Sequence, residues 1–433
     1  MSNTSSCPLE ADLRFAVGAT RAYFTPIIVV TGILGNIATL IIFTLEARLS
    51  RWNRFGIYCS ALAVSDAGVL LVSGLLDDFL GRGLMHATGR AVLKLDTVSV
   101  ASCKLLEFLQ NYFLFVSAHL LLAFTVDRLL GVWRPLRFAA RGCVRETVGA
   151  VLAVCVAGLA LNAPAAVVYD VAEEWHSRQN DSASTAGQSA GLHLWRTCHV
   201  TCNATTENRL ANFAIYYKGF GIFVVPFGLQ VALSAALLYL LLRARRRRRE
   251  LLSPTSSPGS GLQDSHRIEL SRYYANLALS LASCLLAAPL CVAIVMRANC
   301  GVCNPRDSCW CRYLAQLTKL LDSVQDASFA AGFWVYLACV ASFRQRVAFA
   351  GAVVCLSGGC ISSESVNRAP VRRAEELLTR SQRRRRPGAY ASSLMQKRRS
   401  GSHVGGNGGS AGGDDRKTVE MQPLNEPSEV MQE

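Results

Sequence analysis

Long runs without charged side chains constrain this chain more than any other feature of its sequence. A helix that crosses a bilayer needs about 20 mostly apolar residues, because its backbone polar groups must be satisfied within the segment. Six such runs carry at most one charged residue each: Ala22–Leu45, Phe55–Leu76, Phe108–Val126, Thr147–Tyr169, Gly219–Leu242 and Tyr273–Met296. A seventh, Tyr313–Phe343, holds Lys319, Asp322 and Asp326 in its first half. The sequence therefore predicts an all-α membrane protein with a bundle of seven transmembrane helices.

The charge balance narrows the classes of protein to which the chain can belong. Lys and Arg number 45 against 30 Asp and Glu, a net charge of +15, yet only 17% of the 433 residues are charged. Soluble domains hold about a quarter of charged residues, so the charges here must be segregated from the apolar runs. A nucleic-acid-binding protein with an apolar core is one such class, and a membrane protein with basic flanks is the other. The apolar runs favour the membrane protein, and no nucleic-acid partner is expected.

Basic residues flank the predicted spans unevenly. They gather after the first span at Arg48, Arg51 and Arg54, after the third from Arg128 onward, and after the fifth in Arg243–Arg249. Cytoplasmic loops carry the excess of Lys and Arg, which places the N-terminus outside, as in a multi-pass protein of the plasma membrane. The N-terminal residues are polar and do not resemble a signal peptide. The N-glycosylation sequons then fall on outer segments, at Asn3, Asn180 and Asn203.

The chain is expected to hold one membrane domain. Residues 1–21 form an extracellular N-terminus, residues 22–356 the seven-helix domain, and residues 357–433 a cytoplasmic tail. The tail is rich in Arg, Ser and Gly, so it is predicted to be disordered. The segment Ser342–Val354 has the pattern of a short amphipathic helix on the inner membrane face. Palmitoylation is predicted at the two thiols that follow, Cys355 and Cys360, with unmodified thiols as the alternative.

Short motifs recur at ordered places along the predicted spans. They are, in chain order, Gly35-Asn36, Leu62-Ala63-Val64-Ser65-Asp66, Asp127-Arg128-Leu129, Trp133-Arg134-Pro135-Leu136, Pro226 and Pro289. In their order, spacing and placement, these motifs resemble those of the rhodopsin-like (class A) G-protein-coupled receptors. Receptors for neuropeptides are the type within that class that the chain suggests.

Cysteines concentrate on the segments assigned to the outside, where oxidising conditions favour disulfides. The resemblance implies that Cys103 pairs with either Cys198 or Cys202. Four more crowd the loop before the seventh span with a spacing that also suits zinc, although an extracellular position favours disulfides. These four are Cys300, Cys303, Cys309 and Cys311. Their pairing stays open.

The resemblance also implies residues that control activation. Asp66 lies in mid-bilayer, where an ionisable side chain is costly, and in the family this position holds sodium. Arg128 is expected to pair with Asp127 beside it and with Glu269 at the inner end of the sixth span. Release of this clasp would open an inner crevice, a two-state element biased by ligand. Tyr336 is the motif residue that remains in the seventh span.

The chain also departs from the family pattern. The fourth span has no Trp, Ala287 replaces the aromatic residue ahead of Pro289, and the seventh span reads Gly332-Phe333-Trp334-Val335-Tyr336 in place of Asn-Pro-x-x-Tyr. These changes indicate a divergent member. They leave open, as an alternative, a decoy receptor that binds a ligand without signalling.

The outer ends of the spans carry the candidate ligand-binding residues. An amine receptor of this family has an Asp where this chain has Gln110, and an opsin has a Lys where it has Asp326, so neither type is expected. Carboxylates in a partly dry pocket suit ligands that contain Arg, through bidentate pairing. We therefore predict a peptide with a basic residue, or else a small ligand. The predicted contacts are Asp77, Asp78, Glu107, Gln110, Asn212, Tyr216, Asp322 and Asp326, with Glu173, Glu174 and Tyr217 nearby.

The predicted function is to convert extracellular ligand binding into activation of a heterotrimeric G protein. An arrestin and a receptor kinase are expected at the Ser-rich tail, and anionic lipid headgroups at Arg243–Arg249. The sequence holds no hydrolase elbow or phosphate-binding loop, so an enzyme is not expected, and sodium at Asp66 is the one cofactor considered. A transporter or channel is a further alternative, which would need inverted repeats or helices broken at midplane.

Overall fold

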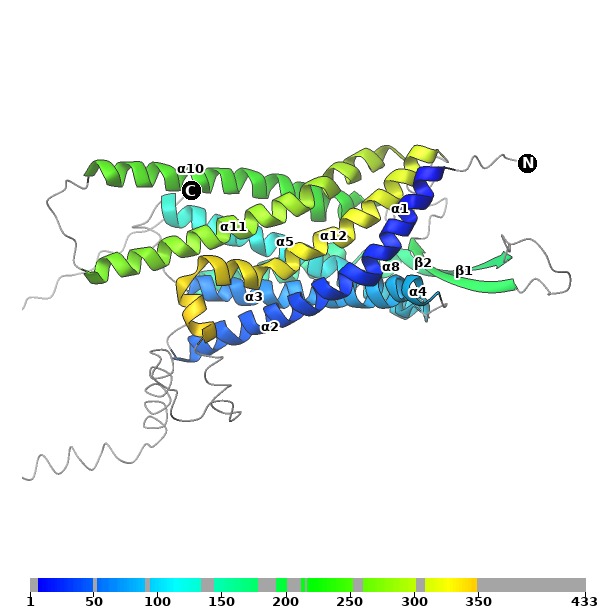
Figure 1. The fold of residues 1–433 in the computed structure, drawn as a ribbon, viewed down its shortest axis with the longest axis horizontal. Helices are drawn as coiled ribbons and strands as arrows, with labels where there is room; N and C mark the ends of the chain where they lie inside the picture. The colour runs from blue at the N-terminus through cyan, green and yellow to red at the C-terminus, as the bar shows by residue number, and fades with distance from the viewer. Residues whose placement is uncertain are drawn as a thin grey trace, which may run out of the picture. The chain divides into compact units, whose positions relative to one another are not determined.

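Helices account for most of the part of the chain that the structure describes. The computed structural model describes residues 7–49, 53–89, 94–133, 144–177, 192–200, 212–214, 216–251, 260–300 and 308–348. All of them belong to one compact unit, Met1–Ser365, in which long helices run side by side (Figure 1). Several predicted features lie outside the described residues: Asn3, Asn180, Asn203, Cys355, Cys360 and the tail 357–433.

The first three spans are long helices, two of which contain π-helical turns. The first consists of α1 (Pro8–Ala19), the π-turn η1 (Thr20–Phe24) and α2 (Thr25–Leu49). The second consists of α3 (Arg54–Val69), the π-helical η2 (Leu70–Gly83) and α4 (Leu84–Thr88). A short turn, η3 (Leu95–Thr97), leads into the third, α5 (Val100–Trp133).

The remaining four spans complete the bundle. The fourth is α7 (Val144–Asn162) with α8 (Ala165–Val168), and the fifth is π-helical η4 (Tyr217–Val224) with α10 (Val225–Leu251). The sixth is α11 (Ser260–Arg297) with the turn η5 (Ala298–Cys300), and the seventh is α12 (Cys309–Cys339), which bends by 97° into Ala341–Ala348. Six helices are long and apolar enough to cross a membrane alone, and the bent pair adds the seventh. The predicted seven-helix bundle is confirmed.

The bend after α12 has a packing cause. Phe343 is fully buried, with its ring centroid 5.7 Å from that of Phe43 and 5.8 Å from that of Tyr336. Arg344 donates to two carbonyls near the end of α12, at 3.1 and 2.6 Å, and so satisfies acceptors that a helix end leaves open. The helix predicted over Ser342–Val354 is confirmed for its described part.

The first helix starts earlier than the sequence predicts. It begins at Pro8, whereas the apolar run begins at Ala22 and the sequence assigns residues 1–21 to a separate extracellular segment. Arg21 is the reason, because this charge ends the apolar run but its side chain is only 6% exposed and lies 2.9 Å from Asp78. A charge that is paired inside the bundle does not end a helix. The boundary at residue 21 was therefore wrong.

A β-hairpin between the fourth and fifth spans is the one described part that is not helical in type. Strands β1 (Tyr169–Ser177) and β2 (Leu192–Val200) pair antiparallel, with Val171 opposite Cys198. Cys198 is disulfide-bonded to Cys103 at the outer end of α5, which ties the hairpin to the third helix. The all-α prediction therefore omits this hairpin, although it identifies the bundle.

Disulfides rather than a zinc site occupy the outer cysteines that the structure describes. Cys103 pairs with Cys198, Cys7 with Cys309, and Cys300 with Cys311. The first of these is one of the two pairings that the family resemblance implies. Cys202 and Cys303 lie outside the described residues, and no cluster of metal-ligating side chains is found among the described ones.

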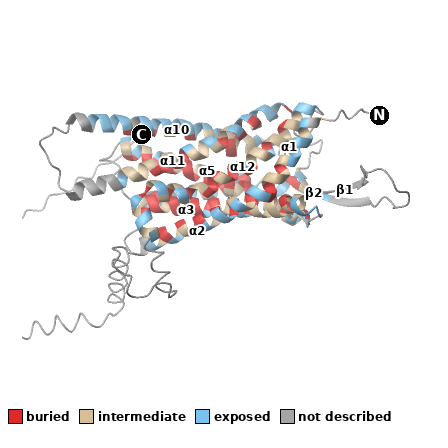
Figure 2. Cartoon of the chain, viewed as in Figure 1, coloured by how far each residue is buried: buried red, intermediate tan, exposed pale blue. Residues whose placement is uncertain are grey.

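Apolar side chains fill the core and also cover much of the outside of the bundle. Phe124 and Leu120 of the third helix are among the largest fully buried side chains. Figure 2 shows exposed residues along the outward faces of the helices, and these include Ile27, Leu34 and Leu152. An apolar surface of this extent is unusual for a soluble protein. Lipid is the environment that suits it.

Candidate functional site

A cavity of about 530 Å³ opens at the outer ends of the third, fifth, sixth and seventh helices, beneath the hairpin. This size falls within the range of pockets that hold small ligands, about 300–1,000 Å³. Its lining includes Gln110, Tyr216 and Asp322. These are three of the eight predicted ligand contacts.

Cations dominate the charged lining of this cavity. Lys218 comes from η4, Arg297 from the end of α11 and Lys319 from α12, whereas Asp322 is the one acidic residue among the lining residues. Lys218 lies 3.2 Å from Glu107. Arg297 donates to the Thr318 hydroxyl at 3.2 Å. Within the described residues, neither Arg297 nor Lys319 forms an ion pair with a carboxylate, so the cavity is set up to receive negative charge.

Aromatic rings form the apolar part of the wall. Tyr216 stacks on Phe220 with ring centroids 6.3 Å apart, and Tyr169 of the hairpin and Phe223 complete the lining. Burial raises the pKa of Tyr169 to about 12, and a hydrogen bond with Glu107 acts in the same direction. The phenol therefore stays neutral at physiological pH, where it presents a ring and a hydroxyl rather than a charge.

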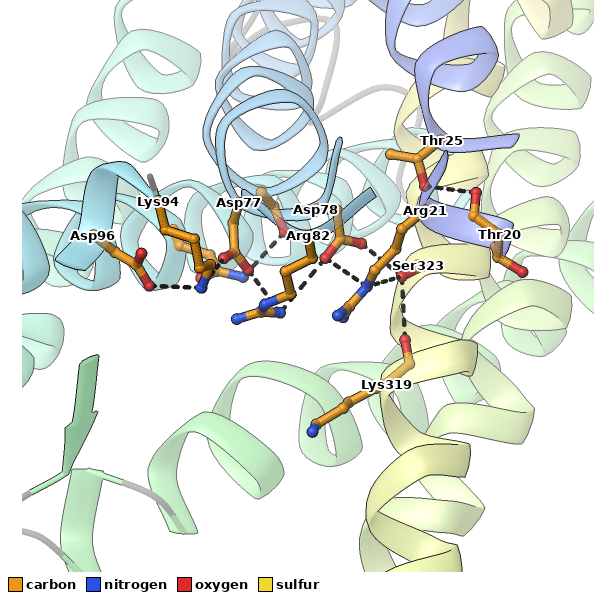
Figure 3. Close-up of polar contacts among 12 residues, drawn as sticks. Thr20, Arg21, Thr25, Asp77, Asp78, Arg82, Lys94, Asp96, Lys319 and Ser323 are labelled. Atoms are coloured by element: carbon orange, nitrogen blue, oxygen red, sulfur yellow. Dashed lines mark hydrogen bonds and ion pairs between the residues drawn. The ribbon is translucent and has the colours of Figure 1, made fainter. Parts of the chain in front are cut away.

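A network of ion pairs lies beside the cavity and joins the first, second and seventh helices (Figure 3). Arg21 lies 2.9 Å from Asp78, and the Ser323 hydroxyl donates to the same carboxylate at 2.6 Å. Asp77 pairs with Arg82 at 3.0 Å and with Lys94 at 3.4 Å. Lys94 also reaches Asp96, at 2.9 Å. We call these residues, with Ser323, the outer ion network.

Three predicted ligand contacts belong to ion pairs of the chain itself, which corrects the expectation of free carboxylates at the outer mouth. Asp77, Asp78 and Glu107 are neutralised by Arg82, Lys94, Arg21 and Lys218. A carboxylate that is paired inside the protein has little left to offer a basic ligand. Asp322 is the predicted acid that does line the cavity.

Two further predicted contacts do not line the cavity. Asp326 is buried below it, and its Oδ2 atom has no hydrogen-bond partner among the described residues. Asn212 is exposed at the start of the fifth span. The side chains of Glu173 and Glu174 lie outside the described part, although both residues belong to β1.

Sequence reasoning missed the cations of this region. Arg21, Lys218 and Arg297 each border an apolar run, where a basic residue resembles an ordinary membrane flank. Each of the first two lies in a π-helical turn, η1 or η4, and Asp77, Asp78 and Arg82 lie in η2. Such turns rotate side chains relative to a regular helix and are frequent at functional sites. A count of basic residues at the outer ends of the spans would have been the available signal.

The inner end of the bundle shows a different charge arrangement from the predicted clasp. Arg128 is buried and pairs with Asp127 at 2.9 Å, and Asp127 also accepts from Arg54 at 3.0 Å. Glu269 is bound instead to Arg272, its neighbour on the same helix, at 2.7 Å. The pairing of Arg128 with Asp127 is therefore present, whereas the predicted pairing with Glu269 is absent.

Uncharged side chains join the third, fifth and sixth helices one turn further into the bundle. The Gln230 amide of α10 donates to Thr125 of α5 at 2.9 Å and to Ser280 of α11 at 2.6 Å. Asn276 of α11 also donates to Thr125, at 3.4 Å. Together these four residues are called the inner amide cluster. They hold the sixth helix in the position that the predicted clasp was expected to secure.

Asp66 lies in a small polar space deep in the bundle. It accepts a hydrogen bond from Ser117, and a cavity of about 50 Å³ beside it is lined also by Gln325 and Ser328. The Oε1 atom of Gln325 has no partner among the described residues. An oxygen-rich set with an unsatisfied acceptor suits a hard cation such as sodium. Tyr336, the other predicted activation residue of this region, is buried nearby among aromatic rings.

Comparisons with known proteins agree with this architecture. The family described as 7 transmembrane receptor (rhodopsin family) matches residues 35–327. The Y-type purinoceptor 2 of Homo sapiens is 31% identical over 241 residues, which are 56% of this chain and 53% of that protein. Its counterpart in Mus musculus is 30% identical over 244 residues, 56% of this chain and 54% of that protein. The chain thus spans about half the length of the curated relatives it matches. It belongs to the rhodopsin family of seven-transmembrane receptors.

Proposed function

We propose that this receptor responds to a small anionic ligand from outside the cell, and that a purine nucleotide is the class that fits best. One observation carries the proposal: Arg297 and Lys319 line the cavity without a carboxylate partner among the described residues. The relatives are named purinoceptors, which supports a purine as the ligand.

The cavity offers complementary contacts to each part of a nucleotide. The guanidinium of Arg297 can bind phosphate oxygens in a bidentate manner, and the Lys319 ammonium adds a point charge. Tyr216 and Phe220 supply ring faces against which a flat purine base can stack. Asp322 is placed to accept a hydrogen bond from a hydroxyl or an amine of the ligand.

A panel of nucleotides tests the proposal on the full chain expressed in cells, with intracellular calcium as the readout and a promiscuous G protein present. At least one purine nucleotide is expected to activate the receptor, and Arg297→Gln should weaken its potency by about tenfold or more. Lys104→Gln removes a cation that does not line the cavity and serves as the matched control. A receptor that ignores every nucleotide while it reaches the cell surface would contradict the proposal.

A peptide with a basic residue is the second candidate, because Asp322 lines the cavity and forms no ion pair among the described residues. The two candidates predict opposite effects of Asp322→Asn. Loss of this carboxylate should weaken a basic peptide strongly, whereas a polyanionic nucleotide should bind equally well or more tightly. A neuropeptide library screened in the same cells decides between them.

We further propose that the receptor couples to a heterotrimeric G protein through the inner end of the third helix. Arg128 is held there by Asp127, in a bundle whose sixth helix is secured by uncharged hydrogen bonds that can open. A non-signalling decoy is the alternative, suggested by the altered motif at Tyr336. Ligand binding without any G-protein or arrestin response would establish the decoy, and the family assignment speaks against a transporter or channel.

Several smaller expectations remain proposals of the same kind. Sodium at Asp66 would stabilise the resting receptor, which a comparison of thermal stability in sodium and in potassium chloride can detect. Receptor kinase and arrestin recruitment, glycosylation at Asn3, Asn180 and Asn203, and palmitoylation at Cys355 and Cys360 are accessible to mass spectrometry of the expressed protein.

A further inference from the structure

Three cations from three helices approach one another beside the cavity. Arg21 lies in η1, Arg82 in η2 and Lys319 in α12. The Arg21 side chain is 6% exposed and that of Arg82 is 37% exposed. Figure 3 shows the Lys319 ammonium and the outer nitrogens of both guanidinium groups around one space.

Each guanidinium uses only part of its donor set inside the protein. Arg21 binds Asp78 and the Ser323 hydroxyl through its Nε atom, at 2.9 and 3.3 Å. Arg82 binds both Asp77 and Asp78 through Nη1, at 3.0 and 3.7 Å. The other nitrogens of these two groups form no hydrogen bond or ion pair within the part of the chain that the structure describes. Free donors therefore remain on the side away from the carboxylates.

The electrostatic surroundings of Lys319 are one-sided. The charged groups that act on its ammonium are Arg82, Arg21, Arg297 and Arg14, and all four are cations. The carboxylates of the outer ion network face the other side of the arginines. Like charges that converge in a partly buried place repel one another strongly. An anion held between them would remove that repulsion.

We propose that Arg21, Arg82 and Lys319 form an anion subsite for the terminal phosphate of a nucleoside di- or triphosphate. Two planar guanidinium groups and an ammonium match an anion with several oxygens better than they match a single halide. Lys319 also lines the cavity, so a ligand whose base lies between the aromatic rings can extend its phosphates toward the first and second helices. The identity of this ligand rests on the proposed function, whereas the anion site itself does not.

Thermal unfolding of the purified full-length receptor in detergent tests the site without any need for activation. Inorganic tripolyphosphate is the probe, compared with sodium chloride at equal ionic strength. The probe is expected to raise the melting temperature of the wild type. Arg82→Gln and Lys319→Gln should each require about tenfold more probe for the same shift, whereas Lys104→Gln should behave as the wild type.

The outcomes separate the subsite from the proposed function. No stabilisation of the wild type, or an equal probe requirement in Arg82→Gln, would overturn the subsite. Stabilisation that depends on Arg82 in a receptor that ignores nucleotides would preserve the subsite and reject the nucleotide ligand. Arg82→Lys keeps a charge at this position and controls for folding, so partial recovery in that variant is expected.

A series of ligands distinguishes a phosphate contact from a merely structural role. Adenosine mono-, di- and triphosphate share one base and differ in the reach of their phosphates. Arg82→Gln should lower the potency of the triphosphate by about tenfold and leave that of the monophosphate within about twofold. An equal loss for all three nucleotides would mean that Arg82 only positions the helices, and would refute the contact.

Discussion

The outer and inner halves of the bundle are held together by different chemistry. At the outer end, Arg21, Asp78, Asp77, Arg82 and Lys94 join helices through charged pairs. At the inner end, the inner amide cluster joins the third, fifth and sixth helices through uncharged groups. Breaking a buried ion pair leaves a stranded charge, whereas a neutral hydrogen bond contributes only about 0.5–1.5 kcal/mol. The outer half is therefore built to stay in place, and the inner half to move.

The largest expected effect follows from removing one member of the outer ion network. Asp78→Asn should lower the free energy of unfolding by about 3 kcal/mol or more, because it leaves the buried Arg21 guanidinium without its carboxylate. The melting temperature in detergent and the amount of receptor at the cell surface measure this loss. Asp12→Asn makes the same chemical change at an exposed position of α1 and should have no effect. Equal stability of the two variants would break the proposed contrast.

An intermediate effect is expected at the inner amide cluster. Gln230→Leu removes the hydrogen bonds to Thr125 and Ser280 and should shift the equilibrium toward the open inner end by about 1–2 kcal/mol. The expected readout is raised signalling without ligand, at near-normal surface expression. Thr31→Val removes a hydroxyl whose hydrogen bonds stay within its own helix and is the matched control. Unchanged basal signalling would place the restraint on the sixth helix elsewhere.

The smallest effect should come from the residue that the family resemblance singles out. Glu269→Ala breaks an exposed pair with Arg272 on the same helix, and such pairs contribute about 0.5 kcal/mol or less. Basal signalling should therefore stay within about twofold of the wild type. A strong rise would show that Glu269 restrains Arg128 in another state of the receptor, and would narrow the difference between the two halves.

The sequence predicts those parts of the fold that depend on local pattern. Each apolar run became a helix because a backbone in lipid has no other way to satisfy its polar groups. The pairing of Cys103 with Cys198 was likewise one of two alternatives. The start at Pro8 escaped prediction because Arg21 ends an apolar run in sequence, yet in space it meets Asp78 of another helix.

The candidate site was less accessible to sequence reasoning. The acids at the outer mouth were identified, but their charge was assigned to a ligand because their partners lie far away in the chain. Glu107 meets Lys218 across 111 positions, and Asp78 accepts from Ser323 across 245. Tertiary structure alone brings such groups together. The sign of the cavity's charge therefore emerged only from the structure.

The disulfides give the bundle a fixed end. Cys7–Cys309 joins the first helix to the seventh, and Cys300–Cys311 joins the sixth to the seventh. From that covalent anchor, α11 runs through 38 residues, about 57 Å at 1.5 Å per residue. A lever of this length converts a tilt of about 5° at the anchored end into about 5 Å of travel at the free end. A ligand that moves its contacts only slightly at the outer cavity can thus displace the inner tip of the sixth helix by the width of a side chain.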